Sequence, residues 1–229
     1  MIKFKNSEIT PENIYKKRRS FIKSIGLSAS TLAMSAIPFV NKSLASERDK
    51  LTSYKDITTY NNYYEFGTSK SDPYRNSQIF KTTPWDITIE GEVEKPIKLS
   101  MEEISEMFIS EERIYRLRCV EGWSMVIPWM GFSLSKLLSK VNPTNKAKFV
   151  EFESVYDPAQ MKGQRYPVLN WPYNEGLRID EAMHPLTTVV TGLYGKKLPN
   201  QNGAPLRIFI PWKYGFKSAK AIVKIKFVE

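Results

Sequence analysis

Residues able to do redox or metal chemistry are scarce in this sequence, and the first of them is a single cysteine. Cys119 lies in the stretch RLRCVEGWSMVIPW, and no second cysteine is present to pair with it. Three roles suit a lone thiol: a small buried apolar side chain, a disulfide to another molecule, or a thiolate bound to a metal. Arg116 and Arg118 fit the third role, because nearby positive charge favours a thiolate and attracts an anionic group.

Protein side chains alone are too few here for a transition-metal site. Structural zinc takes four ligands and catalytic zinc usually takes three, whereas this chain offers one cysteine and one histidine. The histidine, His184, directly precedes Pro185, where a capping or hydrogen-bonded structural role is the expectation. If Cys119 binds a metal, a non-protein cofactor must supply the other ligands.

The elements that position Cys119 are predicted from the spacing of apolar residues. RIYRLRC places Leu117 and Cys119 on one face and the arginines on the other, so Cys119 falls at the end of a strand. Ser100 and Glu103 form a capping box that begins a short helix, and Ser133 precedes a second helix. Further strands are expected at 85–93, 148–156, 205–212 and 219–229. Because regular βαβ spacing is absent, the prediction is an α+β domain with mixed sheets and short helices.

Two stretches show no clear period. Residues 46–84 are polar and rich in tyrosine, which predicts an extended arm on the body of the domain. Residues 156–178 contain several prolines and glycines, and a long irregular stretch inside a domain is more often functional than idle. Our hypothesis is that Trp171 and Tyr173 of this stretch form part of the rim of a cleft.

The N-terminal segment has the pattern of an export signal. The formal net charge is +10, yet residues 1–45 hold eight Lys/Arg against two Glu, which leaves 26 basic and 22 acidic residues from 46 onward. That remainder is too mild to favour a nucleic-acid partner. Arg18 and Arg19, followed by Ser-Phe-Ile-Lys and a weakly apolar run, resemble a twin-arginine signal, with an uncleaved interfacial anchor as the alternative. We therefore expect a signal peptide at 1–45, the twin-arginine export machinery as a partner, and a mature domain at 46–229.

Four separated blocks of the chain resemble one enzyme family. They are YNNYYEFG at 60–67, ERIYRLRCVEGWSMVIPWMGFSL at 112–134, EGLRIDEAMHPLT at 175–187 and QNGAPLRIFIPWKYGFKSAKAIV at 201–223. In this order they resemble the catalytic subunit of periplasmic protein-methionine-sulfoxide reductases, molybdenum enzymes of the sulfite-oxidase fold. The resemblance implies residues beyond the last strand, whereas the sequence given ends at KIKFVE.

The resemblance implies a molybdenum held by one molybdopterin without an attached nucleotide, with Cys119 as the protein ligand. The positions that match cofactor-contacting residues of the family are Asn61, Tyr64, Glu65, Ser154, Asn202, Arg207, Ser218, Ala219 and Lys220. Ser154 stands where the family carries Thr, which keeps the hydroxyl. Taken singly, several have plainer explanations: Asn202 before Gly203 suits an ordinary turn, and Arg207 suits a solvated strand face.

The chemistry implied by the resemblance is oxygen-atom transfer from methionine sulfoxide in oxidised periplasmic proteins to the molybdenum. Glu121 and Asn62 are the candidates for polar groups near the metal. No haem or dinucleotide motif is visible in the sequence, and the resemblance implies a haem-containing membrane subunit as electron donor. Two alternatives stay open: an enzyme of the same fold acting on small sulfoxides, N-oxides or sulfite, and a cofactor-free exported binding protein.

Overall fold

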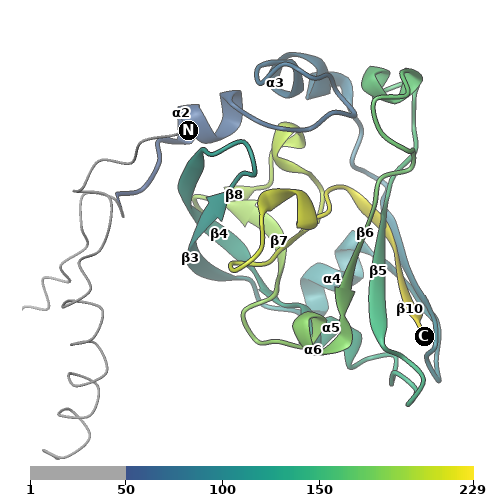
Figure 1. Ribbon diagram of the computed structural model, residues 1–229. Helices are drawn as coiled ribbons and strands as arrows, with labels where there is room; N and C mark the ends of the chain where they lie inside the picture. The colour runs from purple at the N-terminus through teal and green to yellow at the C-terminus, as the bar shows by residue number, and fades with distance from the viewer. Residues whose placement is uncertain (1–49) are drawn as a thin grey trace, which may run out of the picture. The chain divides into compact units, whose positions relative to one another are not determined.

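Two β-sheets form the framework of the domain in the computed structural model, which describes residues 50–229 (Figure 1). The predicted signal peptide at 1–45 lies outside the described residues. The first sheet has the order β2-β1-β10-β5-β6 and is mixed, because β1 and β10 run parallel while the other neighbours are antiparallel. Its strands are β1 (Asp86–Gly91), β2 (Ile97–Ser100), β5 (Phe149–Ser154), β6 (Asn174–Arg178) and β10 (Ile222–Val228).

The second sheet is antiparallel and carries the cysteine. Its order is β3-β4-β7-β8, and β9 also pairs with β7. Its strands are β3 (Glu111–Arg118), β4 (Ser124–Ser133), β7 (Thr188–Leu193), β8 (Lys196–Lys197) and β9 (Arg207–Phe209). In Figure 1 the second sheet lies to the left of β5, β6 and β10 of the first sheet, which lie next to one another on the right.

The helices within residues 50–229 are all short. They are α2 (Tyr54–Thr59), α3 (Asp72–Asn76), α4 (Met101–Met107), α5 (Leu134–Leu138) and α6 (Ile179–Ala182), with 3₁₀ turns η3 (Ser77–Ile79), η4 (Lys162–Arg165), η5 (Asn200–Asn202) and η6 (Gly215–Lys217). The capping box at the start of α4 is present as predicted, since the Ser100 hydroxyl accepts from the Glu103 amide and the Glu103 carboxylate accepts from the Ser100 amide. This mixture of two sheets and short helices confirms the predicted α+β class.

Alternating residues of the strands build the core as the pattern predicts. Ile87 and Ile89 of β1 and Val150 and Phe152 of β5 are fully buried in the larger apolar cluster. A smaller cluster lies on the second sheet and includes Trp129. Apolar side chains on one face of each strand are thereby removed from water, which is the main free-energy gain of folding.

Three predictions about elements were wrong in part. The stretch 46–84 is not simply an extended arm, because it contains α2, α3 and η3, and Ile57 and Phe66 within it are buried. Helices of five or six residues are too short to show a helical period. The stretch 156–178 ends in strand β6, where Leu177 is the only buried residue and leaves no alternation to detect.

The strand expected at 205–212 shortens to β9. Pro205 and Pro211 flank it, and proline has no backbone N–H to donate to a ladder.

Within the described residues, no helix is both long and apolar enough to cross a membrane.

Candidate active site

A cavity of about 330 Å³ opens where the segments 57–65 and 201–220 meet strands β3 and β4. Its apolar side comes from the sheet: Leu117 of β3 and three alternating residues of β4, Met125, Ile127 and Trp129. Residues two apart on a strand point to the same face, so β4 presents all three to the cavity. Its volume lies in the range of about 300–1,000 Å³ typical of sites for small molecules and cofactors.

Cys119 lies one residue beyond the end of β3 and lines this cavity. Its amide donates to the Trp123 carbonyl at 2.9 Å and its carbonyl accepts from Gly122 at 3.1 Å, which closes a tight turn at the strand end. The sulfur accepts from Asn62 Nδ2 at 3.1 Å and faces the Glu121 amide at 3.4 Å. Both N–H groups point at the sulfur and fix its position at the edge of the cavity.

Glu121 is held at the edge of the cavity by an ion pair. Its carboxylate lies 2.8 Å from Lys70 Nζ and accepts from Trp123 Nε1 at 3.3 Å. The hydrogen bond from Lys70 lowers the pKa of the Glu121 carboxyl and raises the pKa of Lys70 against the effect of burial. Glu121 is therefore ionised and fixed in orientation at neutral pH.

The polar side of the cavity carries two buried cations that form no salt bridge within the described residues. Arg207 and Lys220 form no salt bridge with any residue in the part of the chain that the structure describes. Arg207 instead donates to the Asn202 carbonyl at 2.9 Å and lies over the Trp129 ring. Burial lowers the pKa of Arg207 to about 10 and the pKa of Lys220 to about 8. Cations desolvated in this way are costly unless an anionic group completes the site.

The loop at 61–65 is locked by close backbone contact. The Gly163 amide donates to the Glu65 carbonyl at 2.8 Å, and a Cβ at position 163 would lie 2.0 Å from the Tyr64 carbonyl oxygen. Only glycine permits this approach.

Burial raises the pKa of the Glu65 carboxyl, while Lys220 acts in the opposite direction. The site thus contains a buried acid beside a buried base.

Several buried polar atoms around the cavity have no partner in the described structure. These atoms are Asn61 Oδ1, Asn62 Oδ1, Trp129 Nε1, Ser154 Oγ, Asn202 Oδ1, Arg207 Nε and Ser218 Oγ. Native proteins leave few buried polar groups unpaired, so such a concentration points to a polar group that belongs there. A pterin with a phosphate supplies both donors and acceptors and is anionic, so these residues fit the cofactor implied by the sequence.

The structure brings together most of the predicted site residues. The predicted residues that line the cavity are Asn61, Asn62, Tyr64, Glu65, Cys119, Glu121, Asn202, Arg207 and Lys220. The other three, Ser154, Ser218 and Ala219, are buried and do not line it. Two of them touch its wall through the backbone: Ser218 accepts from Arg207 at 3.4 Å, and the Ser154 amide donates to the Tyr173 carbonyl at 2.9 Å.

Other sequence-based interpretations need correction. Arg116 and Arg118 do not line the cavity, because they lie on the opposite face of β3 from Leu117; Arg118 donates to the Pro211 carbonyl at 3.4 Å. Arg207 is buried, so the interpretation as a solvated strand residue is wrong. Of the two proposed rim aromatics, Tyr173 lines the cavity and Trp171 does not.

His184 has the structural surroundings that were expected. Its Nδ1 accepts from the Leu186 amide at 3.2 Å, and its ring packs edge-on against Trp212 at 4.7 Å. Among residues 50–229, no group of three or more His, Cys, Asp or Glu is arranged to hold a metal ion.

Sequence reasoning missed the contribution of β4 and of Lys70. The alternation of Met125, Ile127 and Trp129 was readable in the sequence and would have predicted one shared face. Lys70 carried no such signal, because a lysine in a polar loop is usually solvated; only the fold brings it to Glu121.

Comparison with known proteins gives the class of protein to which this chain belongs. The family model of the oxidoreductase molybdopterin-binding domain matches residues 75–229. The crystal structure of the sulfane dehydrogenase SoxCD from Paracoccus pantotrophus is similar with a TM-score of 0.56 and 14% identity, over 96% of this chain and 60% of that one. At that identity the likeness concerns the fold alone. The fold and the matched domain define a molybdopterin-binding oxidoreductase with the sulfite-oxidase-like fold, as the sequence predicted.

Two curated relatives narrow the family. The protein-methionine-sulfoxide reductase catalytic subunit MsrP of Xanthomonas axonopodis pv. citri is 51% identical over 98% of this chain and 74% of its own length. The protein of the same name from Burkholderia mallei is 50% identical over 97% of this chain and 72% of its own. This chain belongs to the family of protein-methionine-sulfoxide reductase catalytic subunits.

Proposed function

We propose that this chain is the catalytic subunit of a periplasmic, molybdenum-dependent reductase that converts methionine sulfoxide in oxidised proteins to methionine. The observation that carries the proposal is the cavity itself, which is lined by Cys119 and by two buried cations, Arg207 and Lys220, and is surrounded by buried polar atoms that have no partner in the described structure. Identity of about half over nearly the whole chain to the reductase subunits supports the substrate class.

In this proposal the cofactor is molybdopterin without a nucleotide, and Cys119 provides the protein sulfur ligand. The bound molybdenum supplies the two-electron chemistry of oxygen-atom transfer. Arg207 and Lys220 balance the negative charge of the cofactor. The pterin is held by polar groups of seven residues: the side chains of Asn61, Tyr64, Glu65, Ser154, Asn202 and Ser218, and the backbone at Ala219.

The remaining residues orient the thiolate and the substrate. Asn62 donates to the Cys119 sulfur and thereby fixes its direction, as outer-sphere hydrogen bonds do at metal sites. Glu121, held ionised by Lys70, places a fixed negative charge at the cavity edge. The apolar surface of Met125, Ile127 and Trp129 excludes water from one side of the cavity.

Electrons and export need partners. We propose a haem-containing membrane subunit as electron donor and the twin-arginine machinery as the export route, on the basis of the family and of Arg18 and Arg19. Oxidised periplasmic proteins are the proposed substrates.

The test is elemental analysis of the purified protein combined with a reductase assay on a chlorine-oxidised protein. We expect molybdenum in stoichiometric amount and conversion of the protein's methionine sulfoxide to methionine with an artificial electron donor. Turnover of dimethyl sulfoxide, trimethylamine N-oxide or sulfite without turnover of the oxidised protein would assign the chain to a different oxygen-atom transferase. Absence of molybdenum from protein expressed with cofactor synthesis intact would contradict the proposal altogether.

A further inference from the structure

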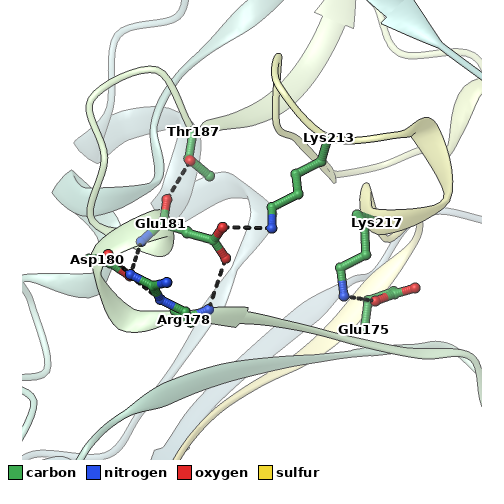
Figure 2. Close-up of polar contacts among 7 residues, drawn as sticks. All are labelled: Glu175, Arg178, Asp180, Glu181, Thr187, Lys213 and Lys217. Atoms are coloured by element: carbon green, nitrogen blue, oxygen red, sulfur yellow. Dashed lines mark hydrogen bonds and ion pairs between the residues drawn. The ribbon is translucent and has the colours of Figure 1, made fainter.

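Residues 212–217, with the sequence WKYGFK, alternate between exposed aromatic side chains and anchored lysines. We call this stretch the aromatic segment. Trp212, Tyr214 and Phe216 expose 44%, 52% and 47% of their surface. The lysines between and after them turn toward the first sheet: Lys213 Nζ lies 2.6 Å from Glu181, and Lys217 pairs with Glu175. Figure 2 shows both lysines reaching across to acidic residues of β6 and α6.

The acidic partner of Lys213 is itself held in place. Glu181 also accepts from the Arg178 amide at 3.2 Å, and its own carbonyl accepts from the Thr187 hydroxyl at 2.6 Å (Figure 2). The lysine therefore binds an acceptor of fixed position, which limits how far this end of the aromatic segment can move.

The backbone of the aromatic segment is fixed at two further points. The Tyr173 hydroxyl is 2.8 Å from the Phe216 carbonyl, and the backbone at Tyr214 forms a parallel bridge with Arg118, the residue before Cys119. The segment is thus attached on one side to β6 and on the other to the end of β3. Its aromatic side chains are exposed on a backbone that is held rigid.

Phe216, near the C-terminal end of the aromatic segment, lies at the mouth of the cavity. Residues that both line the cavity and are exposed mark this mouth, and they include Phe216, Val120 and Leu169. The exposed Tyr214 ring stacks on that of Phe216 with centroids 6.4 Å apart, and Trp212, two residues before Tyr214, is exposed as well. Contiguous exposed apolar surface beside a binding site is typical of an interaction surface.

The charges of the segment select the chemistry of the partner. Both lysines are paired with Glu181 and Glu175, so the unpaired side chains that the segment itself exposes are aromatic. A bulky apolar side chain gains contact area on such rings. Alternate side chains of an extended polypeptide lie about 7 Å apart on one face, which is close to the spacing of the Tyr214 and Phe216 rings.

We propose that the aromatic segment docks the substrate polypeptide next to its oxidised methionine and selects bulky apolar residues two positions from the sulfoxide. This inference rests on the proposed function and adds a sequence preference to it. The segment contributes binding of the flanking chain, while the cavity receives the sulfoxide side chain.

The test compares two peptides that each carry one methionine sulfoxide, flanked at the second position on both sides by Leu and Phe or by Ser. With the molybdenum-loaded wild-type enzyme we expect the KM of the apolar peptide to be about tenfold lower, with similar kcat. The double variant Trp212→Ser/Tyr214→Ser is expected to equalise the two KM values and to leave turnover of free methionine sulfoxide unchanged. Tyr74→Ser/Ile79→Ser removes two exposed apolar side chains that do not line the cavity, and it should keep the wild-type preference.

Binding is measured separately from turnover by fluorescence anisotropy of labelled peptides that carry methionine in place of the sulfoxide. Weaker binding of the apolar peptide to the double variant, at equal molybdenum content, supports the proposal. An unchanged preference in the double variant overturns it, as does an equal loss for both peptides and free methionine sulfoxide, which would indicate damage to the cavity.

Two other occupants of the surface are separate outcomes of the test. If the double substitution changes only the oligomeric state in sedimentation, the surface contacts a second copy of the chain; if it changes only binding to anionic vesicles, the surface contacts membrane. Either result overturns the proposal. Failure of the wild-type enzyme to reduce any sulfoxide would count against the proposed function, while the anisotropy measurement would still decide whether the segment binds apolar peptides.

Discussion

The side-chain amide of Asn62 donates a hydrogen bond to the sulfur of Cys119 over 3.1 Å, although the two residues are 57 positions apart in the sequence. Asn62→Ala removes this donor without adding bulk. We expect molybdenum to be retained and turnover to fall about 10- to 100-fold, the range found for outer-sphere partners of metal ligands. The sulfur-to-metal absorption band should shift as well. The control is Asn145→Ala, at a position remote from the cavity; wild-type turnover and spectrum in Asn62→Ala would contradict the assigned role.

Cys119→Ser tests the ligand itself. The side chain is partly exposed at the edge of a cavity, so its replacement by a smaller oxygen analogue should change the free energy of unfolding by less than about 1 kcal/mol. Activity should be abolished. Circular dichroism and thermal unfolding establish the fold, and the reductase assay establishes the loss. Full activity in a folded Cys119→Ser protein would refute the role of the thiolate.

Lys220→Met should stabilise the cofactor-free protein and weaken its hold on the cofactor. Burial lowers the pKa of Lys220 to about 8, so the charged side chain is penalised in the folded state. Below pH 8 the lysine is protonated in both states and the full penalty applies, which is of the order of 3 kcal/mol. Between pH 8 and the ordinary lysine pKa near 10.5, the folded protein binds fewer protons and the penalty disappears.

The stabilising effect of Lys220→Met should therefore be large at pH 7 and small at pH 10, as measured by urea unfolding of the cofactor-free proteins. The molybdenum content of the variant purified from expressing cells should fall. Equal stability of variant and wild type at pH 7 would show that the buried ammonium costs little. Lys226→Met, at an exposed position of β10, is the control.

Ser154→Ala and Ser218→Ala test whether the unpartnered hydroxyls serve the cofactor. Both oxygens are buried without a partner in the described structure. Removing them should leave the cofactor-free protein as stable or slightly more stable, because no protein hydrogen bond is lost. Cofactor retention, measured as molybdenum per chain after dialysis, should decrease. A marked loss of stability without the cofactor would instead assign the hydroxyls to the protein interior.

Gly163→Ala should disturb the loop that carries Asn61, Tyr64 and Glu65. The added Cβ would lie 2.0 Å from the Tyr64 carbonyl oxygen, so the backbone must move. We expect a loss of about 1–3 kcal/mol in unfolding free energy and reduced cofactor content. Gly176→Ala is the matched control, because its Cβ would meet nothing nearer than the Val150 carbonyl at 3.8 Å. Equal behaviour of the two variants would show that the loop adapts.

Much of the fold followed from local patterns. Alternation at Ile87 and Ile89 or at Val150 and Phe152 reports a strand with one buried face, because side chains of a strand point alternately to its two sides. The capping box at Ser100 could also be predicted, since both of its hydrogen bonds close within four residues. Strand β6 and helices α2 and α3 could not, because elements of five or six residues with few buried side chains carry no period.

By itself the sequence determined that one thiol follows a strand, that too few side chains are present for a protein-only metal centre, and that four blocks match one family. The tertiary structure alone decided which polar groups face the thiol and which cations are buried without a salt bridge. Lys70 reaches Glu121, and Arg207 is buried against Trp129, through contacts between segments far apart in the chain. The physical reason is that local periodicity encodes which face of an element is buried, whereas the charge and hydrogen-bond environment of a side chain depends on what the other elements bring against that face.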